Sequence, residues 1–315
     1  MATSADERII TDESFRWEDY DETEEQVKVK PASEFMSQVI DGFNDLGENV
    51  AGSRWPWHLF DDQRLRIRQG ELTIYAGHSG SYKSMIQSQV AASLMLQDER
   101  CGICSFEMRP KKTLMRFVRQ CSGTDEPSIR YMHDLDRWTR GKLWFYDHLG
   151  TVDPRKLLAV CRYMAQELEI KHIFIDSLMK VMRKTDDLNE QKQFIGDLIA
   201  IAQAQNIHIH LVAHTRKPPA GGGKQTKHDI HGAGEIEKQA DNVLIIQRNN
   251  QLQDGNVAAK DLASFSDEPD VWLTVAKQRE GEFEGVFAMM FNGKSLCVHG
   301  RNEQSWRGVA LEDRQ

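Results

Sequence analysis

The fold of this chain is decided by residues 72–84, which read Leu-Thr-Ile-Tyr-Ala-Gly-His-Ser-Gly-Ser-Tyr-Lys-Ser. The first five residues predict a buried strand, and the run that follows, Met85 to Ala92, predicts a helix. Small residues fill the loop between them, so successive backbone N–H groups can turn towards one point at the positive end of the helix. The sequence therefore predicts a phosphate-binding loop between a strand and a helix.

The loop matches the nucleotide-binding pattern G-x-x-x-x-G-K-[ST] at every fixed position except the second glycine, where Tyr82 stands. Lys83 would supply a positive charge for the β- and γ-phosphates, and Ser84 a hydroxyl ligand for Mg²⁺. An ordinary polar turn before a helix can have a similar sequence, so the rest of the chain has to decide. The predicted nucleotide-binding residues are Gly77, His78, Ser79, Gly80, Ser81, Tyr82, Lys83 and Ser84.

Composition narrows the class of protein. The 315 residues suffice for one α/β domain of about 200–250 residues plus an appendage. The net charge of −8 excludes a globally basic nucleic-acid binder, so any such contact must come from a local patch. No apolar run approaches the roughly 18 residues of a membrane span. Five cysteines without framework spacing indicate a reducing compartment, so we expect a cytoplasmic protein that makes no membrane contact.

Strand-like and helix-like runs alternate from Arg64 onward. This alternation predicts an α/β fold with a mostly parallel twisted sheet flanked by helices, with the phosphate site at the carboxyl ends of strands. Strands are expected at 65–68, 72–76, 102–106, 143–147, 172–176, 207–213, 242–247, 271–276 and 286–290. Helices are expected at 83–97, 110–121, 153–169 and 187–205.

The predicted domain organisation has four parts. Residues 1–30 are acidic and polar and are expected to form a disordered arm. Residues 31–63 are expected to hold a helix and a connector, residues 64–300 the main domain, and residues 301–315 a tail. The helix over 33–45 has one apolar stripe, which can pack either on its own domain or on a neighbouring subunit.

Three further strand ends carry side chains that suit a phosphate site. Asp176 closes an apolar strand and could hold Mg²⁺ through water. Glu107 follows the strand at 102–106 and could orient an attacking water. His214 follows the strand at 207–213 and could touch the γ-phosphate. Each has an ordinary interpretation alone, as a surface carboxylate or a capping histidine, and it is their combination with the loop that favours a site.

Lys277 and Arg279 are two residues apart and so lie on the same side of a strand. Solvated charges on an edge strand are the ordinary interpretation. The alternative is a cation that reaches the phosphates of a neighbouring subunit. Such a cation raises the rate of hydrolysis by a factor on the order of 10³ or more. We expect an edge position in the sheet to keep Arg279 from the phosphates of its own subunit. The Gly-, Pro- and Lys-rich segment 217–228 suits either a phosphodiester backbone or a mobile surface loop.

In their order, these segments resemble the DnaB-like superfamily-four replicative helicases, which include bacterial DnaB, the helicase half of phage primase-helicases and mitochondrial Twinkle. The resemblance runs from about Trp55 to Gly300. It rests on Gln69 to Thr73 leading into the loop, Ser105-Phe106-Glu107-Met108, Phe174-Ile175-Asp176-Ser177-Leu178, His214-Thr215-Arg216-Lys217-Pro218, Gly232 to Asp241, and Ala276-Lys277-Gln278-Arg279 followed by Gly281.

The resemblance implies a RecA-like fold, assembly into a hexameric ring, and 5′→3′ movement along single-stranded DNA driven by ATP or another NTP with Mg²⁺. A separate primase and a DNA polymerase would be further partners. The roughly 50 residues before the main domain leave no room for a primase segment, so we expect a stand-alone helicase or an excised domain. A phage replication module acting in the host cytoplasm is our expectation for its origin.

The resemblance also implies a role for each matching residue. Lys83 and Ser84 would bind the phosphates and Mg²⁺, Asp176 would hold Mg²⁺, and Glu107 would be the catalytic carboxylate. The other implied roles are γ-phosphate sensing by His214, trans contacts by Lys277 and Arg279, base stacking by Phe291, and DNA contacts by Lys224, Lys227, His231, Gly232 and Gly234. The helix over 33–45 would dock on the next subunit.

One residue of the loop departs from the family's pattern, and two other functions also stay open, one of them because a recombination ATPase would share the loop, Asp176 and Glu107. If the loop needs a positive φ at position 82, the tyrosine strains it by about 1–3 kcal/mol. Hydrolysis would then be slow, or the loop would adopt a variant geometry. A RecA-like DNA-dependent ATPase of recombination is one alternative function. A nucleotide-binding ring subunit with little hydrolysis is the other.

Overall fold

The computed structural model describes residues 31–37, 39–40, 50–182, 188–215, 238–249, 268–301, 303 and 308–311. The chain divides into two compact units, Met1–Ala51 and Gly52–Gln315. In the first unit a 3₁₀ turn, η3 (Ala32–Phe35), leads into helical residues at 36–37 and 39–40. The described part of the predicted apolar stripe, Phe35, Met36, Val39 and Ile40, is exposed. Residues 41–45 of that predicted helix and the predicted arm at 1–30 lie outside the described residues.

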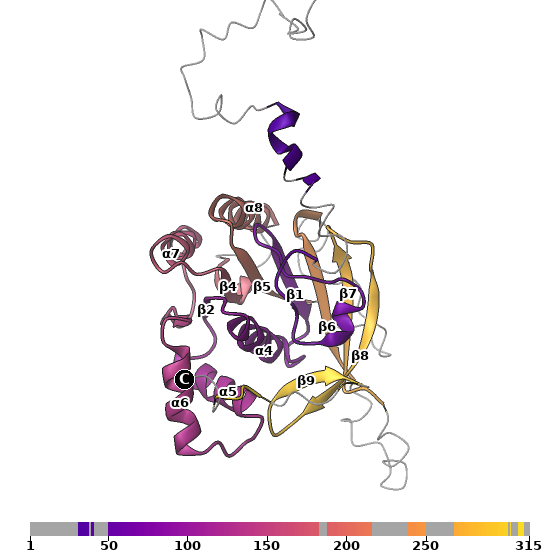
Figure 1. The fold of residues 1–315 in the computed structure, drawn as a ribbon. Helices are drawn as coiled ribbons and strands as arrows, with labels where there is room; N and C mark the ends of the chain where they lie inside the picture. Colours follow the sequence, from indigo (N-terminus) through magenta and orange to yellow (C-terminus); the bar gives the residue numbers. More distant parts are fainter. Residues whose placement is uncertain are drawn as a thin grey trace, which may run out of the picture. The chain divides into compact units, whose positions relative to one another are not determined.

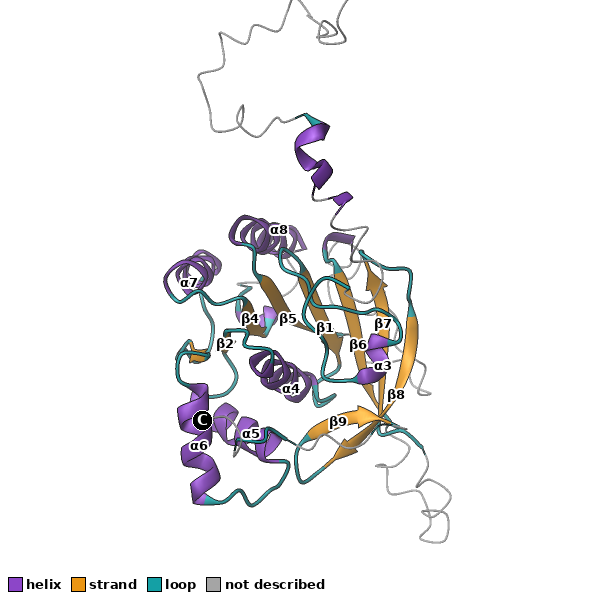
Figure 2. Ribbon diagram, viewed as in Figure 1, coloured by secondary structure: helices purple, strands orange, loops and turns teal. Residues whose placement is uncertain are grey.

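The second unit is built on one large sheet (Figures 1 and 2). In the described residues it has nine strands, in the order β3-β2-β4-β5-β1-β6-β7-β8-β9. All pairs from β3 to β6 are parallel, and the pairs from β6 to β9 are antiparallel. The mostly parallel sheet predicted from the sequence is therefore confirmed. The strands are β1 (Leu72–Gly77), β2 (Cys101–Ser105), β3 (Leu143–Phe145), β4 (His172–Asp176), β5 (His208–His214), β6 (Asn242–Arg248), β7 (Val271–Gln278), β8 (Gly285–Asn292) and β9 (Cys297–Gly300).

Helices cover both faces of this sheet (Figure 1). They are α3 (His58–Asp61), α4 (Lys83–Leu96), α5 (Pro110–Ser122), α6 (Ile129–Thr139), α7 (Pro154–Glu167) and α8 (Leu188–Gln205). Proline begins α5 and α7, where its fixed φ suits the first turn and its missing N–H leaves no bond unmade. The Asp153 carboxylate caps α7 by accepting from the Arg155 N–H, and Gly123 ends α5 in the left-handed conformation that glycine tolerates.

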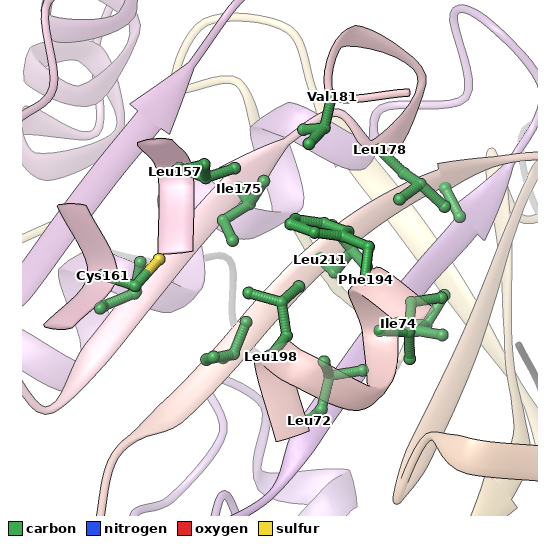
Figure 3. Packing of buried hydrophobic residues seen from close by; sticks show 14 of the residues in the cluster. Leu72, Ile74, Leu157, Cys161, Ile175, Leu178, Val181, Phe194, Leu198 and Leu211 are labelled. Atoms are coloured by element: carbon green, nitrogen blue, oxygen red, sulfur yellow. The ribbon is translucent and has the colours of Figure 1, made fainter. Parts of the chain in front are cut away.

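Each face of the sheet has its own apolar core. Leu157, Phe194 and Leu198 from α7 and α8 lie on one face, in a cluster that also holds Ile175 of β4 and Ile74 of β1 (Figure 3). The other face is covered by α4 and α5 together with Trp57 and Phe60 from the segment before β1. Burial of one such side chain contributes about 1.5–3 kcal/mol. Because all six residues of β1 are buried, the strand is a rigid base for the loop that follows it.

The short strand β9 was not predicted, although it fixes the helix that follows the loop. Gln89 of α4 is buried and bonds the backbone of Val298 twice: its Nε2 donates to the carbonyl at 2.8 Å, and its Oε1 accepts from the N–H at 2.9 Å. The Trp57 indole N–H donates to the same carbonyl at 2.8 Å. Only four residues long, β9 is recognisable through these tertiary contacts and not through its sequence pattern.

The expected strand at 65–68 is wrong in extent. Ile67 exchanges two backbone hydrogen bonds with Ser53, of 2.8 and 2.9 Å, and forms an isolated bridge. The preceding Arg64 has a φ of 53°, and the Leu65 N–H donates to Phe60 of α3. The chain comes out of a tight turn just before this segment. Ile67 therefore pairs with Ser53 as an isolated bridge and not as part of a longer strand.

Candidate nucleotide-binding site

The loop between β1 and α4 is shaped by close backbone contacts. A Cβ on Gly77 would lie 2.4 Å from the Ile246 carbonyl oxygen and 2.5 Å from the Ser81 hydroxyl, so glycine alone fits there. The Ser81 N–H donates to the His78 carbonyl at 3.2 Å, which closes a turn. The N–H groups of the first turn of α4 follow directly, and such groups have no partner within a helix. Together with the helix dipole they make this end of α4 attractive to phosphate.

Tyr82 adopts the conformation that a glycine would be expected to supply. Its φ is 70° and its ψ is 11°, in the left-handed region that costs a non-glycine residue about 1–2 kcal/mol. Its ring stacks on Phe291, with centroids 4.3 Å apart and an interplanar angle of 11°. The Arg248 guanidinium lies 4.5 Å from the same ring. Aromatic stacking contributes about 0.5–1.5 kcal/mol and a cation–π contact about 0.5–1 kcal/mol, so the two contacts are of the right size to offset the strain.

Lys83 is buried at the start of α4 and points back into the loop. Its Nζ donates to the carbonyls of Gly77 at 2.8 Å and His78 at 2.6 Å. Burial lowers the pKa of this lysine to about 8, and the nearby carboxylates of Asp176 and Glu107 limit the fall. Burial thus disfavours the charged form of Lys83. An anionic ligand beside the ammonium would favour the charged form again, so this environment suits the binding of an anion.

Ser84 and Asp176 form the predicted metal pair. The Ser84 hydroxyl donates to Asp176 Oδ2 at 2.6 Å. Asp176 is buried at the end of β4, and burial raises the pKa of its carboxyl while the Ser84 hydrogen bond opposes the rise. A divalent cation beside this pair would remove that penalty, because it favours the ionised carboxylate.

The surroundings of this pair suit a hydrated Mg²⁺. Ser84 and Asp176 line a pocket whose wall also carries the hydroxyls of Ser88, Ser105 and Thr113. Among the described residues, these three buried hydroxyls have no protein hydrogen-bond partner. Buried polar groups of this kind are normally satisfied by water. Mg²⁺ prefers oxygen ligands and keeps several of its waters, so the carboxylate and hydroxyls of this wall suit a hydrated ion. The same wall also carries the apolar Ile103, Met108 and Phe174 and the cation of Arg116.

Glu107 and His214 meet beside the metal pair. Glu107 Oε1 lies 3.9 Å from His214 Nε2 and accepts a hydrogen bond of 3.3 Å from the Ser177 hydroxyl. The His214 imidazole is the main cause that lowers the pKa of Glu107, with Lys180 and Ser177 acting in the same direction and burial opposing them. Glu107 is therefore held ionised at neutral pH, as a residue that orients or deprotonates water must be.

Arg279 lies at the end of the sheet opposite to the loop, where β1 begins and β7 finishes. Its Nη1 is 2.7 Å from the buried carboxylate of Asp241, whose Oδ2 accepts from the Leu72 N–H at the start of β1 at 2.8 Å. The loop follows the other end of β1, and five residue steps of about 3.3 Å separate the two ends. Lys277 lies on the same edge and donates to the Lys238 carbonyl at 2.9 Å.

The sequence predicted that Arg279 follows a strand at the outer edge of the sheet, with a neighbouring strand on one side only. This prediction is wrong. Strand β7 lies between β6 and β8 and pairs with both. The cause is the hairpin that returns the chain from β7 into β8. What keeps Arg279 away from the loop of its own subunit is the antiparallel direction of β7, which ends where β1 begins. Its side chain is 47% exposed, so the guanidinium is accessible from outside the subunit.

The structure thus brings the loop, Asp176, Glu107 and His214 together at one edge of the sheet, and leaves Lys277 and Arg279 at the other. The predicted DNA contacts, Lys224, Lys227, His231, Gly232 and Gly234, lie outside the described residues. Sequence reasoning assigned no role to Ser177, Arg248 or Asp241. Ser177 and Arg248 share the signal that identified Asp176 and His214, because each stands at the carboxyl end of a parallel strand.

This geometry defines an α/β domain whose first strand, loop and helix have the arrangement of a phosphate-binding loop, with a tyrosine in place of the second glycine. Residues 57–297 match the family of the DnaB-like helicase C terminal domain, and the chain belongs to that family. The family identified from the sequence motifs is therefore confirmed.

The chain is similar to proteins of that family over most of its own length. It is 22% identical over 212 residues to the DNA helicase/primase of Enterobacteria phage T3, covering 61% of this chain and 38% of that protein. It is 23% identical over 229 residues to the replicative DNA helicase DnaB of Treponema pallidum (strain Nichols), covering 68% and 48%. The chain spans less than half the length of these two relatives.

Solved structures show the same fold. One of them, an ATPase domain, superposes with a TM-score of 0.73 at 15% identity, covering 86% of this chain and 99% of that one. A DnaB-like replicative helicase, studied for its interactions with primase, gives a TM-score of 0.69 at 14% identity, covering 86% and 67%. The predicted RecA-like fold is thus confirmed. Among the described residues, no helix is long and apolar enough to cross a membrane.

Proposed function

We propose that this chain is the motor domain of a replicative DNA helicase, which hydrolyses ATP or another NTP with Mg²⁺ to move along single-stranded DNA as a ring. The observation that carries the proposal is the convergence of Lys83, Ser84, Asp176, Glu107 and His214 at one edge of the sheet, with Ser84 and Asp176 in direct contact at 2.6 Å. Family membership supports the same activity.

The roles of these residues follow from their surroundings. Lys83 leaves the carbonyls of Gly77 and His78 and donates to the β- and γ-phosphates, which keeps it charged. Ser84 and Asp176 hold Mg²⁺, which when bound neutralises charge on the phosphate oxygens. Glu107 orients the attacking water and accepts its proton. His214 contacts Glu107 and lies directly before the segment that we expect to grip DNA, so it can couple hydrolysis to movement.

A ring arrangement supplies what one subunit lacks. Arg279 is accessible and lies at the far edge of the sheet from its own Lys83. We therefore assign Arg279, with Lys277, to the nucleotide site of the adjacent subunit, where a planar guanidinium suits two phosphate oxygens. We further propose a hexamer, a separate primase and DNA polymerase as partners, and action in the cytoplasm, where the described cysteines stay reduced.

The test is phosphate release by the purified chain, with and without single-stranded DNA, together with strand displacement from a forked duplex. We expect turnover that DNA stimulates. Lys83→Ala and Asp176→Ala should abolish it, whereas Glu107→Gln should still bind nucleotide. Lys142→Ala is the matched control, because Lys142 pairs with Asp98 at 2.6 Å at the other edge of the sheet and should leave turnover unchanged.

Near-normal turnover in both the Lys83 and Asp176 variants would refute the assignment of these residues to the nucleotide site. Nucleotide binding without turnover by the unmodified chain would favour a nucleotide-binding ring subunit. Filaments in place of closed rings in negative-stain images would favour an ATPase of recombination.

A further inference from the structure

Asp241 is a buried residue that is bonded on two sides, to the start of β1 and to Arg279. Its N–H donates to the Leu72 carbonyl at 3.1 Å, and its Oδ2 accepts from the Leu72 N–H at 2.8 Å. Its Oδ1 lies 2.7 Å from Nη1 of Arg279. The side chain of Asp241 is only 4% exposed, whereas that of Arg279 is 47% exposed. The carboxylate therefore joins an accessible cation to the central strand of the sheet.

Two more hydrogen bonds hold Arg279 against the residues just before β6. Its backbone N–H donates to the Asp241 carbonyl at 3.0 Å, and its Nη2 donates to the Gln239 carbonyl at 3.2 Å. A guanidinium has five N–H donors in a planar fork. The Asp241 carboxylate and the Gln239 carbonyl each accept one of them, so enough donors remain for two oxygens of a phosphate.

We propose that Asp241 is a positioning residue for hydrolysis in the adjacent subunit, because it orients the guanidinium of Arg279 for the phosphates bound there. This inference rests on the proposed function and on the trans role that it gives to Arg279. A buried carboxylate that loses its cation is left with an uncompensated charge, which is strongly unfavourable. Arg279 therefore keeps its bond to Asp241 and contacts the phosphates through its remaining donors. A guanidinium that is already held in this way loses less side-chain freedom when it binds.

The first experiment separates hydrolysis from nucleotide binding in the full chain. Asp241→Asn removes the charge but keeps the shape, and its amide oxygen can still accept from the Leu72 N–H. We expect phosphate release to fall about ten- to hundredfold, the effect of losing one hydrogen bond between charged groups. Binding of a non-hydrolysable ATP analogue should change by less than about twofold. Asp98→Asn is the matched control, because it makes the same change at the exposed carboxylate that pairs with Lys142, and it should behave like the unmodified chain.

The second experiment mixes variants to find the side of the subunit interface on which Asp241 acts. Asp241→Asn protein mixed with inactive Lys83→Ala protein should regain phosphate release, because some interfaces then combine an intact loop with an intact Asp241–Arg279 pair. Mixed with Arg279→Ala protein it should regain none, because both variants are damaged on the same side. A merely structural role, in which the variant distorts β1 and its own loop, predicts the reverse pattern. That pattern, or unchanged turnover in Asp241→Asn, would overturn the inference.

A second variant keeps the inference testable if Asp241→Asn protein does not fold. Arg279→Lys keeps the exposed charge but lacks the planar fork that can bond Asp241, Gln239 and a phosphate together. It should hydrolyse at least about tenfold more slowly than the unmodified chain, and equal turnover would overturn the inference. No recovery in mixed rings of Lys83→Ala and Arg279→Ala proteins would refute the trans role and the inference with it. An unmodified chain without turnover would instead overturn the proposed function.

Discussion

The buried Lys83 makes nucleotide binding depend on pH in a direction that the structure fixes. In the nucleotide-free protein its pKa is lowered to about 8, and the phosphates of a bound nucleotide favour its charged form. From pH 7 to pH 9 the protonated fraction of such a lysine falls from about nine-tenths to about one-tenth. Binding above pH 8 must therefore take up a proton, and the dissociation constant should rise about tenfold, or about 1.4 kcal/mol, between pH 7 and pH 9.

The assay is calorimetric titration with a non-hydrolysable ATP analogue and Mg²⁺ at constant ionic strength. The phosphates of the ligand stay ionised in this range because saturating Mg²⁺ favours their fully ionised form. Two buffers of different ionisation enthalpy should reveal uptake of one proton at pH 9. Lys83→Arg keeps a permanent charge and is the matched control, with a flat profile expected. A flat profile in the unmodified chain, or the same slope in Lys83→Arg, would refute the reasoning.

Lys83 also makes the stability of the nucleotide-free protein depend on pH. Rising pH, which weakens nucleotide binding, should increase the free energy of unfolding. A folded pKa of about 8, below the ordinary 10.5, means that folding disfavours the charged form. This penalty is fully present below pH 8 and disappears as pH rises from about 8 to 10.5. It amounts to at most about 3 kcal/mol, so Lys83→Met should raise the free energy of unfolding at pH 7 by about 1–3 kcal/mol. Urea unfolding at pH 7 measures this change, and destabilisation would contradict the assigned pKa.

Two further expectations concern the neighbouring subunit and DNA. Arg279→Ala protein should bind nucleotide and assemble yet hydrolyse poorly, and mixing it with inactive Lys83→Ala protein should restore some phosphate release; mixed rings without any recovery would rule out a trans role. Removing the charges of Lys224 and Lys227 should weaken single-strand binding regardless of sequence and reduce the log–log salt slope by about 0.7 for each phosphate that is no longer neutralised, whereas an unchanged slope would point to another surface.

The sequence predicted best those elements whose signal is local. Helices α7 and α8 lie within a residue or two of the runs expected from their apolar periodicity. The convergence of Asp176, Glu107 and His214 was also predictable, because the carboxyl ends of parallel strands meet at one edge of a sheet. The predicted domain boundaries and site roles stay predictions until they are tested.

Features that depend on tertiary contacts were not predictable. The left-handed Tyr82 is supported by Phe291, about two hundred positions away, and no local pattern indicates that pairing. The position of Arg279 depends on the strand order, which places β7 inside the sheet. Helix α6 was missed because several of its apolar side chains, such as Ile129, are exposed and do not form a core-facing stripe.

The two ends of β1 have a consequence for genetics. One end leads into the loop that holds Lys83, and the other is bonded through Asp241 to the guanidinium that we assign to the adjacent site. In a ring of head-to-tail subunits, every active interface then combines one end from each of two copies. A copy damaged at both ends disables two interfaces, so in mixed rings the intact interfaces fall with the square of the fraction of healthy copies. In the proposed ring, equal amounts of defective and normal copies would leave about a quarter of the interfaces intact, so the defective copy would interfere with the normal one.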